Sequence, residues 1–371
     1  MKKAIVSVTN DLSTDQRVHK TCMVLHEMGF EVTLVGRKRR LSLPIEKREY
    51  KTKRLWLIFE KGPFFYIEFT NRLFWYLLFK KADLLVSNDL DTLLPNFLIK
   101  KLKCIQIVYD SHEYFCGVPE LENRPFVRKI WKTIEKWIFP KLKDVFTVNE
   151  SIANLFKKEY RVDVRVVRNI PIKLENNSTK TREELGLPSD KKIIVLQGAG
   201  INIDRGAEEA VESMQYIENA LLLIIGSGDV LGILKNCVSI LKLEEKVWFI
   251  PKMPFNQLIE YTKNADLGLT LDKDTNINYR FSLPNKLFDY INSGTPIIAS
   301  SLVEIKKIID KYQIGSIIEN HEPSSIAKSI NQALFDNEKL ELWKNNLIIA
   351  AEEMNWENEK KEFINVFKKF A

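Results

Sequence analysis

Two charged side chains stand three residues apart near the start of a predicted helix. The stretch FSLPNKLFDYINSGTPIIAS places Pro284 where a first helical turn would begin and Gly294 where the helix would end. Residues three apart share one face of a helix, so Lys286 and Asp289 lie together beside the unpaired N–H groups of the first turn. An ammonium and free N–H groups suit a phosphate, and a carboxylate suits the two adjacent hydroxyls of a ribose. One helix could therefore hold a nucleoside diphosphate, although an ordinary surface Lys–Asp pair fits the same spacing.

A second candidate phosphate site is the glycine-rich turn in VLQGAGINIDRGAEEAVESM. Gly198 and Gly200 follow a predicted strand, and Arg205 and Gly206 precede a predicted helix. Glycines let backbone N–H groups approach an anion, and an arginine can bind a diphosphate through paired hydrogen bonds. A G-x-G-x-x-G dinucleotide fingerprint would need glycine at the position of Ile203, so a nicotinamide site is weakly supported. A tight turn without a ligand is the alternative.

Alternating strand and helix patterns in the second half of the chain position these two turns. Strands are predicted at 193–197, 221–225, 247–250, 267–271 and 296–299, and helices at 207–214, 255–264, 284–293, 327–335 and 339–353. This alternation indicates a parallel sheet with helices on both faces. Ligands of such sheets bind at the carboxyl ends of the strands, where both turns are expected.

The first half of the chain shows the same alternation. Strands are predicted at 4–8, 31–35, 83–87, 105–109, 144–148 and 164–167, and helices at 16–28, 126–138 and 150–158. The polar segment 171–190 contains two prolines and is typical of a linker. We therefore predict an α/β protein with two doubly wound Rossmann-like domains facing a cleft, one at 1–170 and the other at 191–354.

Length and composition fit this organisation. The chain has 371 residues, of which 45% are hydrophobic and 28% charged, so each half can bury a core of its own. No run reaches the roughly 20 uncharged residues of a membrane span, and residues 1–8 predict a first strand rather than a signal peptide. The four cysteines match no disulfide or metal spacing, which favours a cytoplasmic protein without a metal site: Cys22, Cys104, Cys116 and Cys237.

Charge is distributed unevenly between the two halves. Residues 1–170 carry 32 Lys and Arg against 20 Asp and Glu, and the remaining residues carry 24 against 29. A basic half suggests an anionic partner such as membrane headgroups, a lipid-linked phosphate or a nucleic acid. No nucleic-acid-binding motif is present, so a nucleic acid is not expected. Segments 54–81 and 124–143 interleave aromatic and basic residues, and the second predicts either a helix at an anionic membrane surface or a cover for the first sheet.

Several of these segments resemble the retaining glycosyltransferases of family 4, which have the GT-B fold. In LPNKLFDYINSGTPIIAS, Asp289, Gly294 and Pro296 keep the spacing of the family's nucleotide-sugar motif. NIDRGAEEAVESM is similar to the basic-residue–Gly turn that opens the second domain, with Arg205 where a lysine is commoner. A subset of the family with an NDLxxDQR loop and an LPNKLF[DE]Y motif resembles segments 8–37, 87–95, 109–115, 147–151 and 264–290.

The chain departs from the family pattern at three positions. Phe281 stands where the family often has a first acidic residue, eight positions before the second. That second residue is Asp289 instead of the commoner glutamate. The arginine that usually precedes the basic turn by five residues would fall at Gly200. We therefore infer that Lys286 takes over as the second phosphate cation beside Arg205.

The resemblance implies a reaction and a donor site. A hexose-type sugar would pass from a UDP or GDP sugar to a glycan or a polyprenyl or other lipid-linked acceptor. The anomeric configuration would be retained, no metal or cofactor would be required, and the pathway would be cell-surface polysaccharide or lipopolysaccharide biosynthesis. Arg205 and Lys286 would stabilise the leaving diphosphate. The predicted donor-binding residues are Gly198, Gly200, Arg205, Lys286, Asp289, Asn278 and Asn285.

The resemblance also implies a site in the first domain. His112 is similar to the family histidine that faces the donor sugar, with Glu113 beside it. Asp15, Arg17 and His19 follow the first strand, where an acceptor or donor phosphate could approach, although Asp15 could equally cap a helix. Segment 355–371 would be a helix crossing back to the first domain. A GT-B nucleotide-sugar epimerase and an NAD(P)-dependent oxidoreductase remain alternatives.

Overall fold

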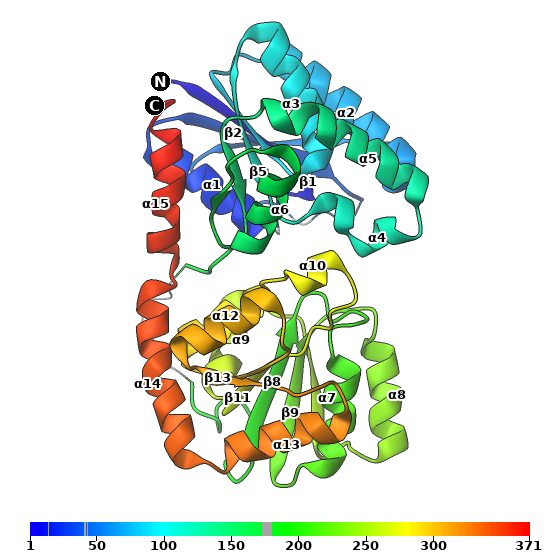
Figure 1. Cartoon of the computed structure of the whole chain (residues 1–371), viewed down its shortest axis with the longest axis vertical. Coiled ribbons are helices and arrows are strands. Elements are labelled where there is room, and N and C mark those ends of the chain that lie inside the picture. The colour runs from blue at the N-terminus through cyan, green and yellow to red at the C-terminus, as the bar shows by residue number, and fades with distance from the viewer. Residues whose placement is uncertain (14, 41, 43, 173–179) are drawn as a thin grey trace. The chain divides into compact units, whose positions relative to one another are not determined.

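The chain folds into two compact units, which are described separately (Figure 1). The structure is a computed structural model and describes residues 1–13, 15–40, 42, 44–172 and 180–371. The first unit contains Met1–Asn169 and Glu359–Ala371, and the second contains Ile170–Asn358. Residues 173–179 of the predicted linker lie outside the described residues.

A parallel sheet of seven strands forms the centre of the first unit. Its order is β3-β2-β1-β4-β5-β6-β7, so the direction in which strands are added reverses between β1 and β4. The strands are β1 (Lys3–Asp11), β2 (Glu31–Lys38), β3 (Lys51–Trp56), β4 (Leu84–Asn88), β5 (Gln106–Ser111), β6 (Val145–Thr147) and β7 (Arg165–Val166). All five residues of β4 are buried, as expected for a central strand covered on both faces.

Helices cover both faces of this sheet. They are α1 (Gln16–Glu27), α2 (Gly62–Phe79), α3 (Leu90–Lys103), α4 (Pro119–Glu122), α5 (Pro125–Ile138) and α6 (Glu150–Tyr160). The last helix, α15 (Trp356–Phe367), packs against the same unit, since the rings of Phe363 and Phe367 lie 4.7 and 6.0 Å from that of Phe146 on β6.

The second unit repeats this design with six parallel strands. The order is β10-β9-β8-β11-β12-β13, and the direction reverses between β8 and β11. The strands are β8 (Lys192–Gly198), β9 (Ala220–Gly226), β10 (Val247–Pro251), β11 (Leu267–Thr270), β12 (Ile297–Ala299) and β13 (Gly315–Ile317). The helices are α7 (Ala207–Ser213), α8 (Leu231–Leu241), α9 (Phe255–Lys263), α10 (Ile277–Arg280), α11 (Asn285–Ser293), α12 (Val303–Tyr312), α13 (Pro323–Leu334) and α14 (Asn337–Glu353).

The predicted fold class, α/β with two doubly wound parallel sheets, is confirmed. The strand order of each sheet reverses at one point. The loops that follow the two strands at this point diverge from each other, and doubly wound folds bind ligands in the space between such loops. Nothing in the described ranges forms a helix long and apolar enough to cross a membrane.

Candidate active site

A buried carboxylate at the end of β11 gathers two cations in the second unit. Asp272 is fully buried, and its Oδ1 accepts a hydrogen bond from Nη1 of Arg205 at 2.7 Å. Nζ of Lys286 lies 3.5 Å from Oδ2 of the same carboxylate. Burial would raise the pKa of Asp272, but Lys286 and Arg205 hold it below its usual range. Two cations around one carboxylate leave a net positive charge at the switch point of the sheet.

Gly206 brings Arg205 to this carboxylate. Its φ is +72°, and a Cβ added to it would lie 2.2 Å from the carbonyl oxygen of Leu271. Only glycine allows so close an approach in that conformation. The turn before α7 therefore lies against the end of β11, which places Arg205 next to Asp272. The guanidinium also lies over the ring of Tyr279, 4.3 Å from its centroid.

Lys286 comes from the first turn of α11, directly after Pro284, as the sequence predicts. Its side chain is mostly buried, and this burial lowers the pKa of the ammonium while Asp272 opposes the shift. An anion placed beside the two cations would favour the charged form of the lysine.

Asp289 lies deeper in α11 and is buried. Its Oδ2 accepts a hydrogen bond from Nε2 of Gln197 at 3.0 Å, and Oε1 of Gln197 accepts one from Thr262 at 2.7 Å. The carboxylate is therefore fixed against β8 rather than lying at an open surface. Its predicted contact with a ribose stays a prediction.

Gly198, the last residue of β8, and Gly200 have open space around them. A Cβ at Gly198 or Gly200 would meet neighbouring atoms no closer than 3.6 Å, so packing does not require glycine at either position. Gly226 and Gly228 differ, because a Cβ there would lie within 2 Å of the carbonyl oxygens of Gly198 and Ile201, respectively. Gly226 and Gly228 are therefore required for the close packing of the turn. Gly198 and Gly200 instead leave their backbone open to a ligand.

The two predicted donor-site asparagines lie on neighbouring short elements. Asn278 is buried in α10, and Asn285 is exposed as the first residue of α11. The predicted contact of these two side chains with the donor stays a prediction.

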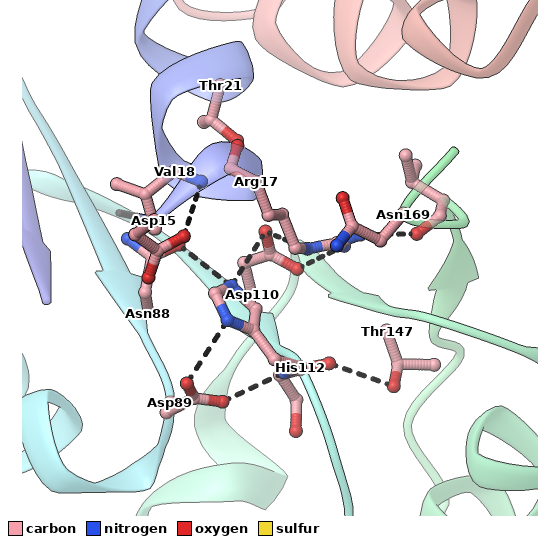
Figure 2. A network of polar contacts seen from close by, with 12 residues as sticks. Asp15, Arg17, Val18, Thr21, Asn88, Asp89, Asp110, His112, Thr147 and Asn169 are labelled. Carbon is pink, nitrogen blue, oxygen red and sulfur yellow. Dashed lines mark hydrogen bonds and ion pairs between the residues drawn. The ribbon is translucent and has the colours of Figure 1, made fainter. Parts of the chain in front are cut away.

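His112 follows β5 in the first unit and is held by carboxylates (Figure 2). The carboxylate of Asp89 accepts a hydrogen bond from the backbone N–H of His112 at 2.8 Å, and it forms an ion pair with ring Nδ1 at 3.2 Å. Ring Nε2 lies 3.6 Å from Oδ2 of Asp110 and 3.3 Å from Oδ1 of Asn88. Burial alone would lower the pKa of His112, but Asp89 and Asp110 raise it to about 9. The imidazole is therefore a cation at neutral pH and a hydrogen-bond donor at both nitrogens.

Arg17 supports this arrangement from α1. It donates from Nη2 and Nε to the two oxygens of Asp110, at 2.6 and 3.0 Å, and from Nη1 to the carbonyl of Val167 at 2.7 Å (Figure 2). The side chain is only 4% exposed. The guanidinium of Arg17 is therefore buried and paired with Asp110, and its predicted contact with an acceptor or donor phosphate stays a prediction.

The other three predicted acceptor-side residues lie near the end of β1 or beside His112. Asp15 caps α1 by accepting from the N–H of Val18 at 3.1 Å, which is the capping alternative, and also accepts from Asn10 at 2.9 Å. Nδ1 of His19 lies 2.6 Å from the hydroxyl of Tyr50. Glu113 is exposed next to His112.

Family models match both units. Residues 15–171 match the model described as Glycosyltransferase Family 4, and residues 177–348 match the one described as Glycosyl transferases group 1. Together the two ranges leave out only the chain's ends and a short stretch between them. The chain belongs to the GT-B glycosyltransferases.

Similar proteins agree with this family. An uncharacterized glycosyltransferase of Methanocaldococcus jannaschii, MJ1607, is 28% identical over 192 residues, which is 50% of this chain and 47% of that protein. The match thus spans about half of the relative's length. Sucrose-phosphate synthase from Thermosynechococcus elongatus superposes over all of this chain and 99% of its own with a TM-score of 0.82 and 17% identity. Anabaena Alr3699/HepE in complex with UDP-glucose covers 100% of both chains with a TM-score of 0.74 and 12% identity. At these identities the two structures show the shared fold.

Three carboxylates of this GT-B glycosyltransferase were not predicted as site residues. Asp272 directly follows the predicted strand 267–271, Asp110 follows 105–109, and Asp89 stands two residues after 83–87. Their position after a strand was the available signal, because carboxyl ends of parallel strands share one edge of a sheet. Within the part of the chain that the structure describes, no three His, Cys, Asp or Glu side chains form a group that could hold a metal ion.

Proposed function

We propose that this chain transfers a hexose-type sugar from a nucleotide-diphosphate sugar to a glycan or lipid-linked acceptor with retention of the anomeric configuration. The observation that carries the proposal is the cluster of Arg205, Lys286 and Asp272, in which two cations share one buried carboxylate. A diphosphate supplies the negative charge that this cluster lacks. The position of the cluster at the strand-order reversal of the second sheet is where doubly wound folds bind nucleotides.

Arg205 and Lys286 stabilise the charge that develops on the leaving diphosphate. The Arg205 side chain is 29% exposed and pairs with Asp272 through Nη1, so its exposed part can meet a phosphate oxygen. Fixed cations in a partly buried site need little reorganisation during the reaction, and removing one such donor costs roughly 3–4 kcal/mol of transition-state stabilisation. This chain's own residues therefore supply the stabilisation, and the proposed reaction requires no metal.

The remaining predicted residues have supporting roles in the proposal. Asp289 accepts hydrogen bonds from the ribose, and the backbone N–H groups at Gly198 and Gly200 meet the diphosphate. Asn278 and Asn285 contribute to donor binding. His112, a cation at neutral pH, donates a hydrogen bond to a sugar hydroxyl and does not act as a base.

UDP sugars are the first donors to test, because Anabaena HepE, which shares the fold, binds UDP-glucose. GDP sugars are the second choice. The acceptor in the proposal is a precursor of a cell-surface polysaccharide or lipopolysaccharide, and the reaction is cytoplasmic. No observation favours an epimerase or a nicotinamide-dependent enzyme.

Incubation with a panel of UDP and GDP sugars tests the reaction. We expect release of the nucleoside diphosphate from one donor in the presence of EDTA, and a product whose anomeric proton keeps the configuration of the donor in NMR spectra. Arg205→Gln and Lys286→Met should each lower turnover about 100-fold or more. Arg280→Gln, which removes an exposed arginine paired with Asp274, is the matched control. Inversion of the anomeric centre would reject retention, and unchanged turnover in both variants would reject the assigned roles.

A further inference from the structure

The first unit exposes an apolar stripe along α2. Phe64, Ile67, Trp75 and Phe79 are each more than half exposed. They lie opposite the buried residues of the helix, which are Phe65, Phe69, Leu73 and Leu77. Helix α2 is therefore apolar on two faces, and only one of them is covered by its own unit. An exposed apolar face made of four large side chains marks an interaction surface.

Helix α5 exposes a second apolar stripe. Phe126 is 74% exposed, Ile130 46% and Trp137 43%, and their spacing of four and seven residues places them on one face. Apart from Met1, Leu102 and Trp56 at the end of β3, the described large apolar residues that are exposed in the first unit all lie on these two helices or on the segment between β3 and α2.

The two helices belong to one side of the unit. Helix α3 packs against both α2 and α5, and the rings of Tyr66 on α2 and Trp131 on α5 lie 5.1 Å apart (Figure 1). We call the seven residues Phe64, Ile67, Trp75, Phe79, Phe126, Ile130 and Trp137 the aromatic surface.

Lysines flank both stripes. Lys61 precedes α2, and Lys80 and Lys81 follow it. Lys129 and Lys136 border the stripe of α5. In the described part of the chain none of these five ammonium groups has a carboxylate within 4.0 Å, and all five residues are exposed. The surface thus combines apolar groups with unneutralised positive charge, within a half of the chain that carries 32 basic and 20 acidic residues over 1–170.

We propose that the aromatic surface docks on an anionic lipid bilayer. Aromatic side chains bordered by lysines suit the interface of a membrane, where rings enter the boundary of the acyl region and ammonium groups meet lipid phosphates. A protein partner or a second copy of the chain would not require the lysines on both helices. The proposal gives the enzyme a place to meet a lipid-linked acceptor, but it does not depend on the donor site.

Flotation of the purified chain with vesicles tests the proposal, using phosphatidylcholine alone and phosphatidylcholine with 30 mol% phosphatidylglycerol (about a third anionic). We expect binding to the anionic vesicles and little to the neutral ones. Phe126→Ser with Ile130→Ser should weaken binding at least about tenfold. Lys129→Gln with Lys136→Gln should weaken it on the order of 30-fold. Ile240→Ser with Phe335→Ser removes two exposed apolar residues of the second unit and should have no effect.

The outcomes separate the possible occupants. Equal binding to both vesicle types, or equal loss in the control variant, would overturn the proposal. So would a dimer in light scattering that the Phe126 and Ile130 variant dissociates, since the surface would then serve a second copy. UDP affinity measured on the same variants without vesicles should be unchanged, so a failed donor site and a failed membrane surface give different results.

Discussion

The imidazole of His112 carries a positive charge because two carboxylates face it. Asp89 contacts Nδ1 and Asp110 lies near Nε2, while Asn88 and the guanidinium of Arg17 complete its charged and polar surroundings. The pKa is about 9 in the folded chain, against an ordinary value of 6.5. A raised pKa means that the folded state binds the proton more tightly than the unfolded state. The contribution of His112 to stability is thus complete below pH 6.5 and is lost as the pH rises through 9.

Urea unfolding at pH 6.5, 7.5 and 9.5 measures this contribution. We expect the free energy of unfolding to fall by roughly 1–3 kcal/mol more in the parent chain than in His112→Gln across that range. Burial raises the pKa of Asp91 and of Glu113 to about 7, and the charge of His112 opposes both shifts. The comparison therefore measures the His112 charge together with its effect on these two carboxyl groups. Equal pH dependence of the two chains would show that His112 is not held as a cation.

At the scale of elements, the turn before α7 depends on one glycine. Gly206→Ala places a Cβ against the carbonyl of Leu271 in a left-handed conformation, so we expect a loss of about 2–4 kcal/mol in the free energy of unfolding. Gly294→Ala is the matched control, because Gly294 has a similar φ of +70° with nothing within 4 Å of the added Cβ, and it should cost only about 1 kcal/mol.

The same two variants separate stability from ligand binding. Gly206→Ala moves Arg205 away from Asp272, so UDP affinity measured by calorimetry should fall, whereas Gly294→Ala should leave it unchanged. Similar losses of stability in both variants would contradict the close packing at Leu271.

Sequence periodicity predicts the elements that alternate clearly between buried and exposed faces. Strand β3 was missed because its sequence, KTKRLW, is mostly exposed and polar, and Leu55 alone is buried. Helix α2 was missed because it is apolar on two faces, which removes the period that reveals a helix. Parallel pairing still follows from strand–helix alternation, since crossovers require it.

The candidate sites were predictable only in part. Lys286 and Arg205 could be found because glycine, proline and charge coincide at the start of a helix. The pairing of Arg17 with Asp110 joins residues 93 positions apart, and that of Arg205 with Asp272 joins residues 67 apart. Such contacts depend on strand order, which local spacing does not encode. This is why the sequence does not predict the buried ion pair between Arg17 and Asp110.

At the scale of the whole molecule, we expect the nucleoside diphosphate to bind the second unit alone. Hydrogen exchange with saturating UDP should slow amide exchange after β8 and at the start of α11, residues 198–206 and 285–289, because the diphosphate meets those N–H groups. Amides at the strand ends of the first unit should change little, because UDP lacks the hexose that the donor would transfer. Protection confined to the first unit would contradict this division.

The central claim is that Arg205 and Lys286 bind the diphosphate of the donor. Calorimetric titration with UDP and with uridine tests it directly, because the two ligands differ only in the diphosphate. Arg205→Gln and Lys286→Met should each weaken UDP binding at least about tenfold, or about 1.4 kcal/mol, and leave uridine binding within about twofold, with Arg280→Gln unchanged for both ligands. Equal weakening of UDP and uridine, or no weakening of either, would contradict the claim.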